Sequence, residues 1–139
     1  MRNEEKNRLT GANLVDAIEA ACDGVFFISE SDSAIKPFFV SVNDAANASD
    51  ALIMTGAGDS DISETSADAF FIRLTTDREW HGERERESVR RFRILRDLLH
   101  ANLSGLRQFR VGRTRVKIFV IGRDYFGNIA GITTNAVET

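Results

Sequence analysis

The sequence contains one cysteine, one proline and two histidines in 139 residues. A lone thiol forms neither an internal disulfide nor a cysteine-based metal site, and Cys22 falls among apolar residues of an expected helix, which predicts a buried, reduced side chain. Residues 1–13 have no apolar run, and no apolar run elsewhere is long enough to span a bilayer. These absences predict a cytoplasmic protein without a secretory signal or a membrane helix.

An excess of positive charge is also missing. The chain has 18 Lys and Arg against 21 Asp and Glu, which gives a net charge of −3 and a pI of about 5.4. Proteins that bind nucleic acid usually carry the opposite balance, so direct binding of nucleic acid is not expected. The length fits one domain. We expect a flexible N-terminus over residues 1–9 and a single domain over residues 10–139.

The common catalytic motifs are absent as well. There is no HxxxH, HExxH, CxxC or GxSxG pattern. His100 falls near the end of an expected helix, where the helix dipole favours a cation. His81 follows Trp80 in an expected turn, and we expect the Trp80 ring to pack at the entry of the next helix. The glycines at 56–58 lack the Lys and Ser/Thr of a phosphate-binding loop and predict a flexible loop. The protein is therefore predicted not to be an enzyme.

The spacing of apolar residues predicts three helices. The first covers residues 10–22. A second, short helix lies within residues 61–74, with Ser66 as its N-cap. The third and longest covers residues 84–103, which contain neither glycine nor proline. Its arginines alternate with glutamates, which is typical of a solvated face with exposed ion pairs; these arginines are Arg84, Arg86, Arg90, Arg91 and Arg93.

Strands are predicted between and after these helices. Short apolar strands are expected at 25–29 and 38–42, with a polar turn between them, and residues 43–61 are expected to form a long surface loop. Three further strands, 108–111, 114–121 and 129–134, are joined by short turns that contain glycine, which is typical of antiparallel hairpins. Residues on both faces of 114–121 are apolar, so both faces should be covered. The predicted fold class is α+β, a three-layer α/β/α sandwich around a mostly antiparallel sheet ending in a C-terminal β-meander.

Two polar clusters follow expected strands. One contains Ser29, Glu30, Ser31 and Asp32, and the other contains Thr133, Thr134, Glu138 and Thr139. Carboxylates held at the end of a rigid strand suit a cationic or metal-bearing pocket of a partner. From residue chemistry alone, the first cluster is better explained as a turn with local side-chain hydrogen bonds.

A set of short motifs carries a family resemblance. They are DGVFFISESD at 23–32, Pro37-Phe38, the pairs Phe70-Phe71 and Thr75-Thr76 with Trp80, and VIGRDYFGNIAGITTNAVET at 120–139. In these residues the chain resembles the nuclease A inhibitor family, whose members block sugar-non-specific DNA/RNA endonucleases of the ββα-metal type. The resemblance extends from Leu14 onward, with no correspondence over residues 43–60. The α/β/α sandwich of that family agrees with the predicted fold.

The resemblance implies a mode of action. Members insert into the active site of the nuclease, and a C-terminal threonine, here Thr139, gives an oxygen ligand to the catalytic divalent metal. Glu30 matches an interface glutamate. No cofactor of its own is expected, since the Mg²⁺ or similar ion belongs to the partner, and hard oxygens can replace its waters. The partner-binding residues expected in this monomeric protein are Ser29, Glu30, Ser31, Asp32, Trp80, Thr134, Glu138 and Thr139.

One departure from the family keeps other functions open. After Trp80, where an acidic stretch is expected, the chain has HGERER at 81–86. Arginines there oppose electrostatic steering toward a basic, phosphate-binding groove. A non-inhibitory interaction module with a changed partner is therefore the alternative to an inhibitor. An enzyme is the third possibility, which the lack of a nucleophile and base disfavours.

Overall fold

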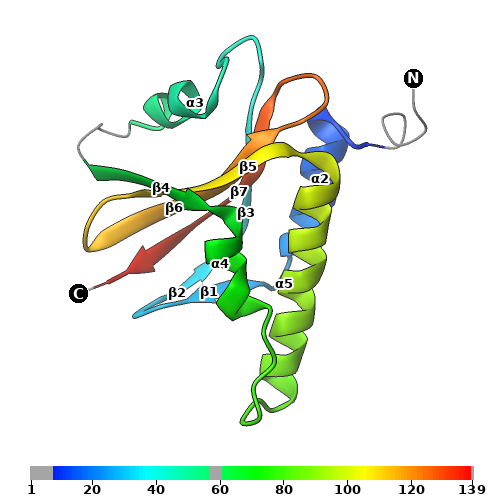
Figure 1. The fold of residues 1–139 in the computed structure, drawn as a ribbon, viewed down its shortest axis with the longest axis vertical. Helices are drawn as coiled ribbons and strands as arrows, with labels where there is room; N and C mark the ends of the chain where they lie inside the picture. Colours follow the sequence, from blue (N-terminus) through cyan, green and yellow to red (C-terminus); the bar gives the residue numbers. More distant parts are fainter. Residues whose placement is uncertain (1–7, 57–60, 139) are drawn as a thin grey trace.

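The computed structural model describes residues 8–56 and 61–138, which form one α+β fold (Figure 1). Within these ranges there are four helices and seven strands. In chain order they are α2 (Gly11–Cys22), β1 (Phe26–Ile28), β2 (Asp32–Ala34), β3 (Lys36–Val40), α3 (Ala48–Met54), β4 (Ile62–Ser66), α4 (Ala67–Leu74), α5 (Glu83–Asn102), β5 (Ser104–Val111), β6 (Arg115–Arg123) and β7 (Ile129–Val137).

The main sheet has five strands in the order β3-β7-β6-β5-β4, and every neighbouring pair is antiparallel. Strands β5, β6 and β7 form the predicted C-terminal meander. The last of them is an inner strand, because β7 pairs with β6 on one side and with β3 on the other. Strands β1 and β2 form a separate two-stranded hairpin.

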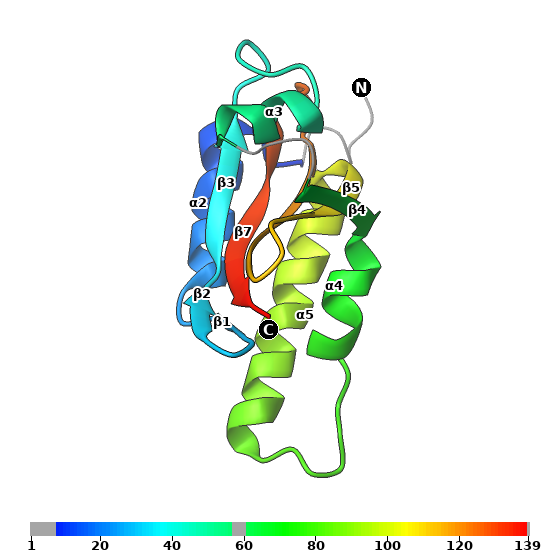
Figure 2. The same cartoon turned by 90° about the vertical axis from the view of Figure 1, so that its left-hand side faces the viewer.

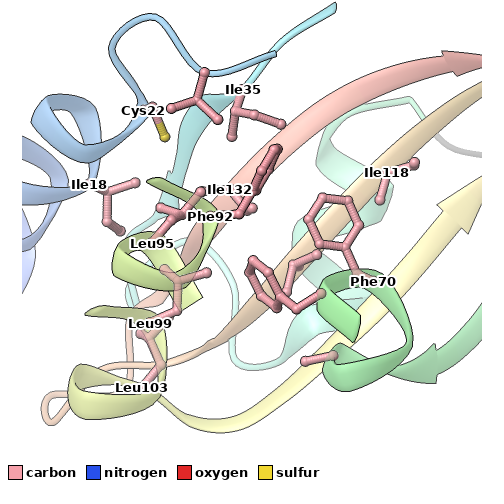
Figure 3. Close-up of a cluster of buried hydrophobic side chains, with 14 of the residues drawn as sticks. Ile18, Cys22, Ile35, Phe70, Phe92, Leu95, Leu99, Leu103, Ile118 and Ile132 are labelled. Carbon is pink, nitrogen blue, oxygen red and sulfur yellow. The ribbon is translucent and has the colours of Figure 1, made fainter. Parts of the chain in front are cut away.

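Helices cover both faces of the main sheet, as predicted from the apolar residues on both sides of β6. Val116, Ile118 and Val120 belong to one buried cluster with α2, α4 and α5, while Phe119 and Ile121 belong to a second cluster with α3. Figure 1 shows α3 on one side of the sheet and α2 and α5 on the other, and Figure 3 shows part of the larger cluster. The predicted three-layer sandwich is confirmed.

The helices form where the apolar spacing predicts them. Helix α5 buries Val89, Phe92, Leu95 and Leu99, which lie on one face at intervals of three and four residues. Burial of a large aliphatic or aromatic side chain of this kind stabilises the fold by about 1.5–3 kcal/mol. The predicted N-cap of α4 is confirmed: the Ser66 hydroxyl accepts a hydrogen bond of 3.1 Å from the Ala69 amide.

The stretch 43–61 was predicted as one long loop, and this prediction is wrong. It contains α3, whose N-cap Asn47 accepts a hydrogen bond of 2.9 Å from the Asp50 amide. Ala51 and Leu52 of this helix pack against one face of the main sheet. Residues 57–60, which include part of the predicted glycine loop, lie outside the described residues, as do residues 1–7 of the predicted flexible N-terminus. Leu9, the last residue of this predicted N-terminus, donates its amide to the Asn102 side chain at 2.7 Å.

Several strand boundaries also differ from the prediction. The stretch 25–29 does not enter the main sheet: β1 pairs only with β2, and the expected polar turn supplies the start of β2. Strand β3 begins at Lys36 and includes Pro37, which an edge strand tolerates. Strand β4 was not predicted, and β7 continues to Val137 instead of ending near Thr134. Strand β5 begins at Ser104 and contains a bulge before Arg107.

Candidate functional site

The tip of the β1–β2 hairpin is a tight turn built by Ser29 and Ser31. The Ser29 amide donates to the Ser31 carbonyl at 2.9 Å. The Ser29 hydroxyl lies 3.2 Å from the same carbonyl and accepts from the Ser31 amide at 3.4 Å. Glu30 sits between the two serines with its side chain exposed. The local hydrogen bonds expected from these residue types therefore exist, and they display Glu30 at the tip.

The same turn is attached to the end of β7. The Val137 amide donates to the Ser29 hydroxyl at 3.0 Å, across 108 positions of sequence. The Glu30 amide lies 3.4 Å from the Val137 carbonyl. Figure 2 shows the hairpin beside the end of β7. The fold thus brings together the two polar clusters that the sequence places far apart.

Glu138 is held by backbone and side chain. Its amide donates to the Thr114 carbonyl at 2.8 Å, and its carboxylate forms an ion pair with the Arg110 guanidinium. Sequence reasoning missed Arg110, because a polar residue within an expected strand carries no signal of a partner so distant in sequence. Thr139, the expected metal ligand, lies outside the described residues. The chain that leads to it is fixed up to Glu138.

Two other expected site residues in this region differ in exposure. Asp32 opens β2 and is exposed. Thr134 is buried, with 3% of its surface exposed, and its hydroxyl donates to the Ala34 carbonyl at 3.0 Å. It therefore ties β7 to β2 from the inside and does not offer its side chain to a partner in this structure.

Trp80 does not pack at the entry of α5 as expected. It lies in the connection between α4 and α5, its side chain is 74% exposed, and its ring contacts the ring of His81 edge to face at 4.4 Å. The start of α5 is instead capped by the Glu85 carboxylate, which accepts from the Gly82 amide at 3.1 Å. Trp80 stands on the wall of a groove between β1 and the first turns of α5.

The arginines of α5 mostly engage groups of the same chain. Arg93 contacts the Asp77 carboxylate and the Thr75 carbonyl, at 3.1 and 3.0 Å. Further contacts join Arg86 to the His81 carbonyl, Arg90 to Glu87 and Arg91 to the Asp23 carbonyl. The predicted exposed ion pairs are therefore present at Arg90 and Arg93, whereas the contacts of Arg86 and Arg91 are hydrogen bonds to neutral carbonyl groups. Each such pair is worth little energy, but it offsets the positive charge that the helix would show to a partner.

The described residues show no metal site, and the cysteine is not activated as a nucleophile. Within 8–56 and 61–138, no three His, Cys, Asp or Glu residues lie together as a metal site would require. Burial, with a smaller effect of the Glu19 carboxylate, raises the pKa of Cys22 to about 12, so its thiol stays protonated at neutral pH. His100 lies 3.7 Å from Asp68 on the surface. In the same part of the chain, no helix is long and apolar enough to cross a membrane.

Comparison with known proteins gives one family. A family model described as "Nuclease A inhibitor-like protein" matches residues 12–139. The matched range includes the hairpin tip, Trp80 and the end of β7. Among curated proteins, none matches the chain.

Proposed function

Because this chain belongs to the nuclease A inhibitor-like family, we propose that it inhibits a sugar-non-specific DNA/RNA endonuclease of the ββα-metal type by occupying the active site. The observation that carries this proposal is the attachment of the hairpin tip to the end of β7. Ser29 and Glu30 hydrogen-bond to Val137, so that one rigid surface presents Glu30 together with the segment leading to Thr139.

Each part of this surface has a chemical role in the proposal. The Glu30 carboxylate pairs with a cationic group of the nuclease that otherwise binds phosphate. Thr139 supplies a hydroxyl or carboxylate oxygen to the divalent metal of the nuclease, since Mg²⁺ keeps water-filled positions that hard oxygens can take. The turn and the end of β7 are ordered before binding, which reduces the entropy lost on association. The protein holds no cofactor of its own in this mechanism and acts as a monomer in the cytoplasm.

The alternative is an interaction module that keeps the fold and has changed its partner. The specific observation in its favour is the ion pair of Glu138 with Arg110, which satisfies a carboxylate near the chain end internally. The exposed Arg84 and Arg86, at the start of α5, also suit a partner less basic than a nuclease groove. Such a module would bind its partner without stopping the cleavage of nucleic acid.

The chain end gives the first test. A short tag fused after Thr139, or deletion of Thr139, should weaken inhibition of a ββα-metal nuclease while thermal unfolding stays unchanged. A tag of equal size at the N-terminus is the matched control and should have no effect. The loss of binding affinity caused by deleting Thr139 should be smaller when the nuclease is stripped of metal. If the C-terminally tagged protein inhibits as well as the untagged one, the metal bridge is wrong.

Glu30 gives the second test. Glu30→Ala should change the free energy of unfolding by no more than about 0.5 kcal/mol, because the side chain is exposed. Inhibition should fall by more, because a cationic group of the nuclease would be buried without its partner. Asp16→Ala, an exposed carboxylate on α2, is the control. Equal inhibition by the Glu30→Ala protein and its parent would remove Glu30 from the site.

A further inference from the structure

A groove of about 840 Å³ runs between β1 and the first turns of α5. Three large apolar side chains on its walls are open to solvent: Phe26 is 50% exposed, Ile28 is 72% exposed and Trp80 is 74% exposed. Leu74 and the buried Val89 also line it. An apolar concavity of this kind on a protein surface typically marks a site of interaction.

The core of the protein does not account for these side chains. Along β1, Phe27 faces inward and its ring stacks on Phe70 at 5.5 Å. Because side chains alternate along a strand, Phe26 and Ile28 face outward on either side of it. Both outward positions of this strand are apolar, where a solvated face would ordinarily carry polar residues.

The charges on the rim of the groove nearly cancel. The acidic side chains there are Glu83, Glu85 and Glu87, and the basic ones are Arg73, Arg84 and Arg91. Several already have partners within the chain: Glu85 caps the Gly82 amide, Glu87 pairs with Arg90, and Arg91 contacts the Asp23 carbonyl. The rim therefore favours neither a phosphate nor a strongly basic ligand. The shape and apolar walls suit an uncharged apolar side chain of a protein.

The groove lies beside the hairpin tip in the sequence and in the fold. Ile28 on its wall is followed directly by Ser29 and Glu30, and Figure 1 shows the hairpin and the α4–α5 connection in the same half of the molecule. A protein bound at Glu30 therefore lies two residues from Ile28 on the wall of the groove. The groove then adds contact area that depends neither on a metal nor on charge.

Resting on the proposed function, we propose that this groove receives an apolar side chain of the nuclease from a loop or helix beside its active site. The interface then has two parts. Glu30 and the chain end form a polar part that depends on the metal, and Phe26, Ile28 and Trp80 form an apolar anchor that does not. The anchor therefore adds affinity that does not depend on electrostatic attraction.

The experiment measures binding of the full chain to a ββα-metal nuclease by calorimetry, with the nuclease loaded with Mg²⁺ and stripped of metal. The groove variants are Ile28→Asp and Trp80→Ala. The controls, Ile94→Asp on α5 and Phe126→Ala in the β6–β7 turn, change apolar side chains that are 55% and 66% exposed and do not line the groove. Thermal unfolding of every variant is recorded, so that a loss of binding is not a loss of fold.

Each groove variant should raise Kd at least about tenfold in both metal states, and each control less than about twofold. A tenfold change corresponds to about 1.4 kcal/mol. Raising the salt concentration should leave the ratio between Trp80→Ala and its parent unchanged, because this variant removes an apolar contact and adds no charge. If the groove variants bind like their parent while Glu30→Ala binds more weakly, the groove is not part of the interface. The proposal that the protein inhibits the nuclease then still stands. A groove effect seen only with Mg²⁺ would overturn the metal-independent anchor. A parent chain that binds no such nuclease would overturn both.

Discussion

Two serines that are equivalent in the sequence motif differ in what their side chains do. The Ser29 hydroxyl contacts the Ser31 carbonyl and amide and accepts from the Val137 amide. The Ser31 hydroxyl forms no hydrogen bond with the part of the chain that the structure describes. Ser29 therefore positions the hairpin tip against β7, whereas Ser31 contributes through its backbone.

This difference gives a prediction for a pair of variants. Ser29→Ala should lower the free energy of unfolding by about 1 kcal/mol, because the Val137 amide loses its acceptor. It should weaken nuclease inhibition by more than that loss of stability explains, because Glu30 is no longer fixed relative to the chain end. Ser31→Ala should leave both quantities near those of the parent. Chemical denaturation and inhibition titrations measure them, and equal inhibition by the two variants would show that the bond to Val137 does not position the site.

Cys22 gives a prediction about pH. Its pKa in the folded protein is raised to about 12, whereas an unfolded chain has a value near the ordinary 9.0. Between these values the folded state holds a proton that the unfolded state has released, so the free energy of unfolding falls as the pH rises above about 9. The slope from this group approaches 1.4 kcal/mol per pH unit. Native protein at neutral pH should react slowly with thiol reagents and denatured protein quickly; fast labelling of the native protein would contradict the buried, protonated thiol.

Residue chemistry predicts some of the site and not the rest. The turn of Ser29, Glu30 and Ser31 is recognisable because a polar triplet ends an apolar run, whereas a role of these residues in binding a partner was implied only by the family resemblance. The burial of Thr134 is not recognisable, because its partner, the Ala34 carbonyl, belongs to a strand that the sequence presents as a turn. Trp80 was expected to be packed, since large aromatic residues usually are. The sequence does not show that the Trp80 ring is exposed, because its exposure depends on the groove that β1 and α5 form beside it.

At the scale of elements, the β6–β7 turn depends on one buried carboxylate. Asp124 is 4% exposed. It accepts from the Phe126 and Asn128 amides at 2.9 and 3.0 Å, from the Asn128 side chain at 2.9 Å and from the Gly11 amide at 3.1 Å. One side chain thus closes the turn and fixes the start of α2 beside it.

Removal of this carboxylate should therefore be costly. Hydrogen bonds to charged groups contribute about 1.5–3 kcal/mol each, and in Asp124→Ala the partly buried donors would lose their acceptor. We expect the free energy of unfolding to fall by at least about 2 kcal/mol, measured by urea denaturation. Asp44→Ala, which changes an exposed aspartate in the turn after β3, is the control and should stay within about 0.5 kcal/mol. A similar small change at Asp124 would mean that the turn forms without its carboxylate.

Elements with a clear apolar period were predictable, and those stabilised by distant partners were not. Helix α5 and strand β6 carry regular patterns that local sequence determines. Strand β4 reads ISETS and shows no strand-like alternation of large apolar residues, because it is an edge strand held by its pairing with β5. Helix α3 is short and buries only Ala51 and Leu52 fully, which is too few apolar positions for a helical period to be recognised in the sequence. The phenylalanines of β1 indicate a core strand, although Phe26 faces the groove.

At the scale of the whole molecule, the charge distribution predicts how the protein meets nucleic acid. The net charge is −3, and Arg90, Arg93 and Arg96 of α5 form ion pairs with carboxylates of the same chain. Non-specific affinity for DNA comes from uncompensated cations that displace counterions, and this excess is missing here. We expect no degradation of DNA or RNA, with or without Mg²⁺, and only weak binding. A gel shift at low micromolar protein and moderate salt would contradict this prediction.

The three-layer architecture follows from a property of one strand, whereas the site follows from the assembly of the whole chain. Apolar residues on both faces of β6 require cover on both sides, which is enough to predict the layers. The contact of Ser29 and Glu30 with Val137 requires β7 to pair with β6 and to extend to the hairpin. No local pattern contains that information, since the contact joins opposite ends of the chain.

The inner position of β7 has a consequence for the order in which the protein is made. Strand β3 pairs only with β7, through contacts such as Phe38 with Gly131. A nascent chain that has emerged from the ribosome only as far as β6 can close the β5–β6 hairpin, but β3 and the β1–β2 hairpin still lack the strand that ties them to the sheet. Translation must therefore pass β7 before the contact of the hairpin tip with Val137 can form, and nascent chains that stall earlier expose apolar segments to chaperones and proteases.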